Sequence, residues 1–134
     1  MRDLDEKIRI IIIEPAPVVA STLKEILNLK GYEASAFTDP IQGLDAVLAE
    51  GPNLVIAAVV MPEATGIELA IQVKQSCLDC KILLWSGAPE TTILIKMAQA
   101  QGYEFEIIPK PIYPEALLSK IREVISDPLV AQGA

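Results

Sequence analysis

The stretch that decides the fold is NLVIAAVVMP, residues 53–62. Its apolar run from Leu54 is typical of a strand buried on both faces, and Met61-Pro62 begins a loop. In parallel α/β sheets, ligands and chemistry lie just beyond the carboxyl ends of the strands. The residue at the end of this predicted strand is Ala58, which offers only a methyl group.

Strand-like and helix-like segments alternate on both sides of this stretch. Predicted strands cover residues 8–13, 32–37, 53–58, 81–85 and 104–108, and predicted helices cover about 17–30, 40–50, 66–76, 89–101 and 113–125. Such alternation indicates a doubly wound α/β fold, with five parallel strands and helices on both faces. We expect one domain over residues 8–126, a charged tail at 1–7 and a tail or linker stub at 127–134.

Apolar residues at helical spacing predict the face that each helix turns to the sheet. The predicted inner residues are Val19, Leu23, Ile26 and Leu27 in the first helix, Ile41, Leu44, Val47 and Leu48 in the second, Ile67, Leu69, Ala70 and Val73 in the third, and Leu117, Leu118, Ile121 and Val124 in the last.

Composition limits the possible partners. The 134 residues are 51% hydrophobic, enough for one folded domain with its own core. The net charge of −7 argues against nucleic acid as a direct partner, because phosphate binding needs clustered Lys and Arg. The apolar runs fall far short of the ~20 residues of a membrane span, and the charged N-terminus lacks a signal-peptide core. We therefore expect no membrane partner and a cytoplasmic location.

The chain has no histidine, which removes the usual general base and the commonest metal ligand. Two cysteines, Cys77 and Cys80, form a lone Cys-x-x-Cys. A zinc site needs further thiolate or imidazole ligands, which this chain lacks. A redox pair usually opens a helix after a strand, whereas this pair follows a helix. We predict two reduced cysteines in a loop.

Four predicted strands deliver residues to one rim of the sheet. Glu14 and Pro15 follow the first strand, Ala58 ends the third, Ser86 follows the fourth and Lys110 follows the fifth. Because the carboxyl ends of parallel strands share one edge, this set is the candidate functional site.

The pattern resembles the receiver domain of bacterial response regulators. The features that carry the resemblance are Pro17, Met61-Pro62, Gly66, Ser86 and Lys110-Pro111, in order and at similar spacing. It covers about residues 9–125. It implies a flavodoxin-like sheet with strand order 2-1-3-4-5 and a role in two-component signal transduction or a phosphorelay.

The resemblance assigns roles that this chain departs from. In receivers, an aspartate ending the third strand accepts a phosphoryl group, and two acidic residues after the first strand bind Mg²⁺ with it. Here Ala58 stands at the acceptor position, and Glu14 and Pro15 stand at the acidic pair. Alanine has no nucleophile, and proline has no side-chain oxygen for Mg²⁺. We expect Mg²⁺ binding and aspartyl phosphorylation to be lost, and we predict no other cofactor or metal.

Other parts of the site follow from the same resemblance. Receivers carry a switching Tyr or Phe three residues before the lysine, and here that position is Ile107, with Phe105 nearby. Fewer carboxylates at the rim relieve repulsion, so we predict an ion pair between Lys110 and Glu14. The Lys110-Pro111 bond is expected to be cis.

The leading interpretation is a pseudo-receiver: a signalling module that is not an enzyme, is not phosphorylated in the usual way and acts by protein–protein interaction. A protein partner or a homodimer is expected on the fourth helix, fifth strand and fifth helix, by analogy alone. Two alternatives stay open. One is a phosphoaccepting receiver with a non-standard acceptor, and the other is a small-molecule or anion sensor using Ser86 and Lys110.

Overall fold

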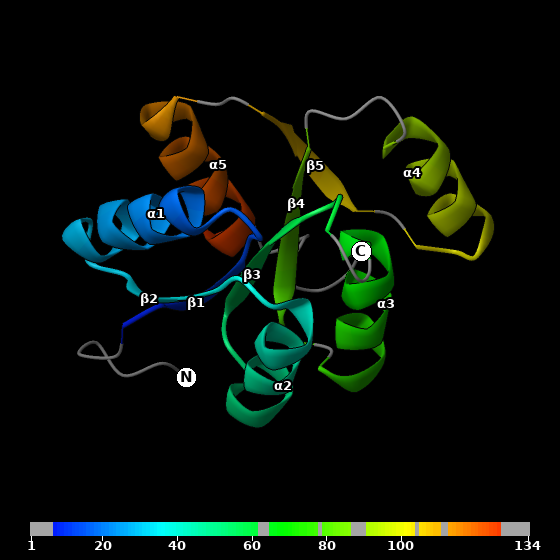
Figure 1. Ribbon diagram of the computed structural model, residues 1–134, viewed down its shortest axis with the longest axis horizontal. Helices are drawn as coiled ribbons and strands as arrows, with labels where there is room; N and C mark the ends of the chain where they lie inside the picture. The colour runs from blue at the N-terminus through cyan, green and yellow to red at the C-terminus, as the bar shows by residue number, and fades with distance from the viewer. Residues whose placement is uncertain are drawn as a thin grey trace.

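The computed structural model describes residues 7–61, 65–77, 79–86, 91–103, 105–110 and 113–126. Within them, strands and helices alternate (Figure 1). The elements are β1 (Arg9–Ile13), α1 (Pro17–Leu29), β2 (Glu33–Phe37), α2 (Pro40–Glu50), β3 (Leu54–Ala58), α3 (Gly66–Ser76), β4 (Lys81–Ser86), α4 (Thr91–Ala100), β5 (Glu106–Pro109) and α5 (Pro114–Ser126).

The five strands form one parallel sheet in the order β2-β1-β3-β4-β5. Figure 1 shows α1 and α5 on one face of the sheet and α2, α3 and α4 on the other. The predicted doubly wound fold and its strand order are confirmed. The chain moves one way across the sheet from β1 to β2 and the other way from β2 to β5, so right-handed crossovers place α1 on one face and α2, α3 and α4 on the other.

The centre of the sheet is β3, in which every residue from Leu54 to Ala58 is buried. β1 lies on one side of it, with Ile13 opposite Ala57, and β4 lies on the other, with Ala58 opposite Trp85. A strand covered by helices on both faces reads as a continuous apolar run, which explains why this stretch predicts the fold.

A glycine fixes the way the chain leaves β3. A Cβ atom on Gly66 would collide with the carbonyl oxygen of Ala58. The Gly66 N–H donates to the carbonyl of Val59 at 2.7 Å, so α3 begins directly against the end of the strand. Thr65 caps this helix, its hydroxyl accepting from the Glu68 N–H at 3.1 Å.

Two predicted helix faces need correction. Val19 of α1 lies at the surface, and the small Ala20 is buried beside Leu23 and Leu27 instead. In α2 the buried residues are Pro40, Gly43 and Val47, whereas Ile41 and Leu48 are exposed. The reason is Gly43, where a Cβ would lie 2.7 Å from the Ile13 side chain. Because Gly43 has no side chain, α2 can lie close to β1 at this position, and the larger side chains of the helix face outward. The inner faces predicted for α3 and α5 are confirmed.

β5 starts and ends later than predicted, at Glu106–Pro109 rather than 104–108. Pro109 is the last residue of the strand and lies opposite Ser86. β5 is an edge strand, and a proline is tolerated there because its missing N–H breaks no central ladder. α4 covers Thr91–Ala100 and ends one residue before the predicted end, and the predicted residues 89 and 90 lie outside the described residues.

The prediction for the cysteines was wrong, because Cys77 and Cys80 are joined by a disulfide. α3 ends at Ser76, and the chain turns at once towards β4, which brings the two Cα atoms to 5.7 Å. That separation is ordinary for a disulfide. The bridge lies at the amino end of β4, the end of the sheet opposite the candidate rim.

Candidate functional site

The structure brings Glu14 and Lys110 together at the carboxyl ends of β1 and β5. The Lys110 ammonium nitrogen lies 2.8 Å from Glu14 Oε1, which confirms the predicted ion pair. The other carboxylate oxygen, Oε2, accepts a hydrogen bond from the Ala16 N–H at 2.9 Å. Both oxygens of Glu14 therefore have donors, one from the far strand and one from its own turn.

Glu14 is the buried charge of this site, with 1% of its surface exposed. A carboxylate taken out of water is strongly unfavourable unless a cation and hydrogen-bond donors replace the lost hydration. The side chain of Lys110 is 34% exposed and reaches in from the surface to supply that cation. The charge of Glu14 at the rim is thus neutralised by Lys110, a residue of the same chain.

Sequence reasoning missed Trp85, which completes this cluster. Its ring lies under the Lys110 ammonium, 4.8 Å from nitrogen to ring centroid, a cation–π geometry. The position next to Ser86 at the end of a predicted strand was the available signal. Successive side chains of a strand point to opposite faces of the sheet. The Trp85 side chain points to the face that α1 and α5 cover.

The remaining predicted residues contribute less to this cluster. Ala58 is fully buried at the end of β3 and contributes a methyl group and its backbone. Ser86 ends β4, and its carbonyl accepts from the Lys110 N–H at 3.2 Å. Ile107 lies in β5 opposite Leu84, packed against the core, and Pro15 is half-buried in the turn after β1.

The aromatic residue nearest the switch position is Phe105. It stacks on Tyr103, with ring centroids 6.1 Å apart and planes 6° from parallel. The predicted cis bond at Pro111 and the motif residue Pro62 lie outside the described residues.

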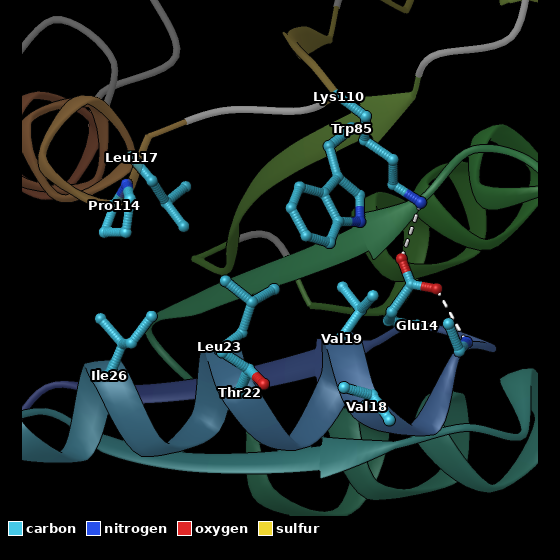
Figure 2. A pocket seen from close by; sticks show the side chains of 11 residues that line it. Glu14, Val18, Val19, Thr22, Leu23, Ile26, Trp85, Lys110, Pro114 and Leu117 are labelled. Atoms are coloured by element: carbon cyan, nitrogen blue, oxygen red, sulfur yellow. Dashed lines mark hydrogen bonds and ion pairs between the residues drawn. The ribbon is translucent and has the colours of Figure 1, made fainter.

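A groove adjoins the ion pair. It lies between α1 and α5, has a volume of about 550 Å³, and is apolar over most of its wall. Figure 2 shows Lys110, Glu14 and Trp85 at one end, with Val19 and Leu23 along α1 and Leu117 on α5. The rim cluster therefore borders a cavity on the α1–α5 face of the sheet.

Neither a cluster of metal ligands nor a membrane-spanning helix is found among the described residues. Among them, no three His, Cys, Asp or Glu side chains gather as metal ligands. Within the same ranges, no helix is both long and apolar enough to cross a membrane.

The family model of the response regulator receiver domain matches residues 10–122. The chain therefore belongs to the response regulator receiver domain family, as its motifs predicted. The strand order of the sheet agrees with that match.

Curated relatives and solved structures agree with this assignment. The chain is 24% identical over 118 residues to the response regulator MprA of Mycobacterium bovis, covering 88% of this chain and 50% of that protein. It is 24% identical over 127 residues to MprA of Mycolicibacterium vanbaalenii, covering 95% and 54%. The chain thus spans about half the length of these relatives.

Two solved structures are close in shape. One is a CheY-like receiver domain protein from Methanospirillum hungatei, with a TM-score of 0.81, 25% identity, and coverage of 91% of this chain and 96% of that one. The other is the signal receiver domain of an HD domain-containing protein from Pseudomonas fluorescens, with a TM-score of 0.82, 22% identity, and coverage of 96% and 100%. The second likeness bears on the fold alone.

Proposed function

We propose that this receiver domain works in two-component signalling as a pseudo-receiver, a module that is not phosphorylated at the usual position and is not an enzyme. The observation that carries the proposal is the end of β3, where the side chain is the buried methyl group of Ala58. Phosphoryl transfer to a protein needs a nucleophilic oxygen at the site. No acidic residue occurs anywhere from 53 to 61.

The β1 end supports the same proposal. Mg²⁺ requires several oxygen ligands in near-octahedral geometry. Pro15 offers no side-chain oxygen, and both oxygens of Glu14 are engaged by Lys110 and Ala16. By resemblance to the family, Lys110 stands where receivers carry a lysine that binds the phosphoryl oxygens. In this proposal it pairs with Glu14 instead, and the rim stays in one charge-neutral state without Mg²⁺.

The output proposed is protein–protein interaction, through α4, β5 and α5. Two large apolar side chains on this side of the molecule, Met97 and Tyr113, are exposed. Charged residues occur on the same elements, with Lys120 of α5 paired to Glu106 of β5 and to Glu123. Exposed apolar side chains on elements that also carry charges are a feature of interaction surfaces. Ile107 at the switch position fits a face that does not depend on an aromatic rotation.

The acidic balance supports one further part of the proposal, the kind of partner. With a net charge of −7, this domain acts on a protein partner or a second copy rather than on nucleic acid. The location we propose for it is the cytoplasm.

Beryllofluoride with Mg²⁺, which mimics an aspartyl phosphate, tests the loss of phosphorylation. We expect unchanged tryptophan fluorescence from Trp85 and an unchanged molar mass by size exclusion with light scattering. The variant Pro15→Asp/Ala58→Asp restores the carboxylates and should gain a Mg²⁺-dependent response if it folds, with a phosphoaccepting receiver run alongside as a reagent control. A Mg²⁺-dependent response of the unaltered chain contradicts the proposal.

The interaction face has its own test. Met97→Glu places a charge on α4, and Leu29→Glu is the matched control at a highly exposed position of α1. We expect Met97→Glu to weaken self-association or partner capture while Leu29→Glu does not. Equal effects of the two variants, or an effect of Leu29→Glu alone, would place the interaction elsewhere.

A further inference from the structure

The groove between α1 and α5 has the size and lining of a small-molecule site. Its volume of about 550 Å³ lies inside the range of roughly 300–1,000 Å³ typical of such sites. Val19, Leu23 and Ile26 form one wall, and Pro114 and Leu117 form the opposite wall. Apolar walls with a few polar groups at one end are what ligand sites share, and the polar end here is the rim cluster (Figure 2).

The polar end of the groove is rich in donors. The Trp85 side chain is 95% buried (5% exposed), and its Nε1–H has no hydrogen-bond partner within the described part of the chain. Lys110 carries three N–H donors, of which Glu14 receives one. The carboxylate oxygens of Glu14 are both engaged already, so the groups that remain for a ligand are N–H donors.

The charges at the polar end of the groove determine which kind of hydrogen-bond acceptor can bind there. The positive charge of Lys110 is balanced by Glu14 at 2.8 Å, so the end of the groove is close to neutral. The whole chain carries −7, which disfavours an anion further. A cation is disfavoured by the ammonium group itself. The acceptor that fits is an uncharged one.

We infer that this groove binds a small, uncharged, largely apolar molecule with a carbonyl group at one end, of the aliphatic ketone or ester class. The carbonyl oxygen accepts from Trp85 Nε1–H and the Lys110 ammonium, and the hydrocarbon part lies between α1 and α5. Nε1 is covered in this structure, so binding in this way requires the indole to rotate until its N–H meets the carbonyl. The site shares Glu14 and Lys110 with the rim cluster, and its ligand test uses the unphosphorylated chain.

The single tryptophan provides a direct measurement, because the chain gives one indole N–H signal in a proton–nitrogen NMR spectrum. Methyl heptyl ketone is the probe, and octanoate is its charged counterpart of similar length. We expect the ketone to shift the indole signal saturably and octanoate to bind more weakly or not at all. Absence of a saturable shift up to the solubility of the ketone, or tighter binding of octanoate, overturns the inference.

Three variants, measured by calorimetry with the same ketone, locate the site. Trp85→Phe keeps an aromatic wall but removes the donor, and we expect affinity to fall about 2- to 10-fold, the worth of one hydrogen bond. Val19→Glu puts a charge into the apolar wall at a surface position of α1 and should weaken binding at least about tenfold. Leu29→Glu, on the same helix and outside this groove, should leave it unchanged. Equal affinities for all variants would mean that the ketone binds elsewhere and would overturn the assignment.

Discussion

Two lysines of similar exposure form ion pairs in very different surroundings. The side chain of Lys110 is 34% exposed and pairs at 2.8 Å with Glu14, whose side chain is 2% exposed. The side chain of Lys120 is 28% exposed and pairs at 3.1 Å with Glu106, whose side chain is 49% exposed. Lys120 also contacts Glu123 at 3.5 Å. The lysines are nearly matched, so the difference between the two sites lies in the carboxylates.

This difference shows at which of the two ion pairs the stability of the receiver domain depends on charge. Glu106 and Glu123 keep their contact with water when Lys120 is absent, so their pairing is worth little. Glu14 has no such alternative, because β1 and the turn before α1 bury it. The rim is therefore a place where removing one partner leaves an uncompensated charge inside the protein.

The largest effect is expected from Lys110→Met. Breaking a buried pair costs about 3–5 kcal/mol, and we expect about 2–4 kcal/mol here because the ammonium is partly exposed. Lys120→Met is the matched control, with an expected loss of about 0–1 kcal/mol. Urea denaturation of both variants gives the two free energies of unfolding. Similar losses at the two lysines would remove the distinction between the sites.

A double variant sharpens the same comparison. Glu14→Gln keeps an acceptor for the Ala16 N–H while removing the charge. We expect Glu14→Gln/Lys110→Met to recover at least half of the stability lost in Lys110→Met, because no buried charge is left. If the double variant is as unstable as Lys110→Met, the packing of the Lys110 side chain, rather than its charge, stabilises the rim.

Gly66→Ala tests the backbone that supports the rim rather than its charges. The added methyl group would collide with the carbonyl oxygen of Ala58, which β3 holds in place. We expect a loss of about 1–3 kcal/mol, typical of overpacking, seen as a lower urea midpoint. A neutral result would mean that α3 can move away from β3 freely.

Reduction of the Cys77–Cys80 disulfide should have a smaller effect, at the end of the sheet away from the rim. The bridge closes a very short loop, so chain entropy predicts a loss of about 2 kcal/mol or less. The matched measurement is the urea midpoint of Cys77→Ser/Cys80→Ser beside that of the oxidised chain. A loss as large as that of Lys110→Met would show that this end, rather than the rim, controls stability.

The smallest expected effect is the pH dependence of the stability that the exposed Lys120–Glu106 pair contributes. The hydrogen bond from Lys120 to Glu106, helped by the charges of Glu106 and Glu123 against some desolvation, raises the pKa of Lys120 above its ordinary 10.5. A raised lysine pKa stabilises the fold below 10.5, and that contribution disappears as pH rises through the folded-state value. The stability difference between the wild type and Lys120→Met should be constant near neutral pH and shrink only above about 10.5. A difference that already changes near neutral pH contradicts this origin.

The fold and the ion pair could be predicted from sequence because both depend on alternation and strand ends. A continuous apolar run such as 54–58 has few places other than the centre of a parallel sheet. Glu14 and Lys110 each follow a strand directly, so the parallel topology alone brings them to one rim.

The features that sequence reasoning missed depend on packing at particular positions. The face of α2 turned because Gly43 lets the helix approach Ile13, an effect that hydrophobic spacing does not register. The size of the groove depends on how far apart α1 and α5 lie, which no local pattern encodes. The disulfide depends on how tightly the chain turns after α3.

The central claim is that this receiver domain keeps the architecture of its family without aspartyl phosphorylation. The most direct measurement is the intact mass of the chain after incubation with acetyl phosphate and Mg²⁺, with a phosphoaccepting receiver treated in parallel. The account predicts that the control gains a phosphoryl group and that this chain, with Ala58 at the end of β3, gains none. A Mg²⁺-dependent gain of one phosphoryl group on this chain would contradict it.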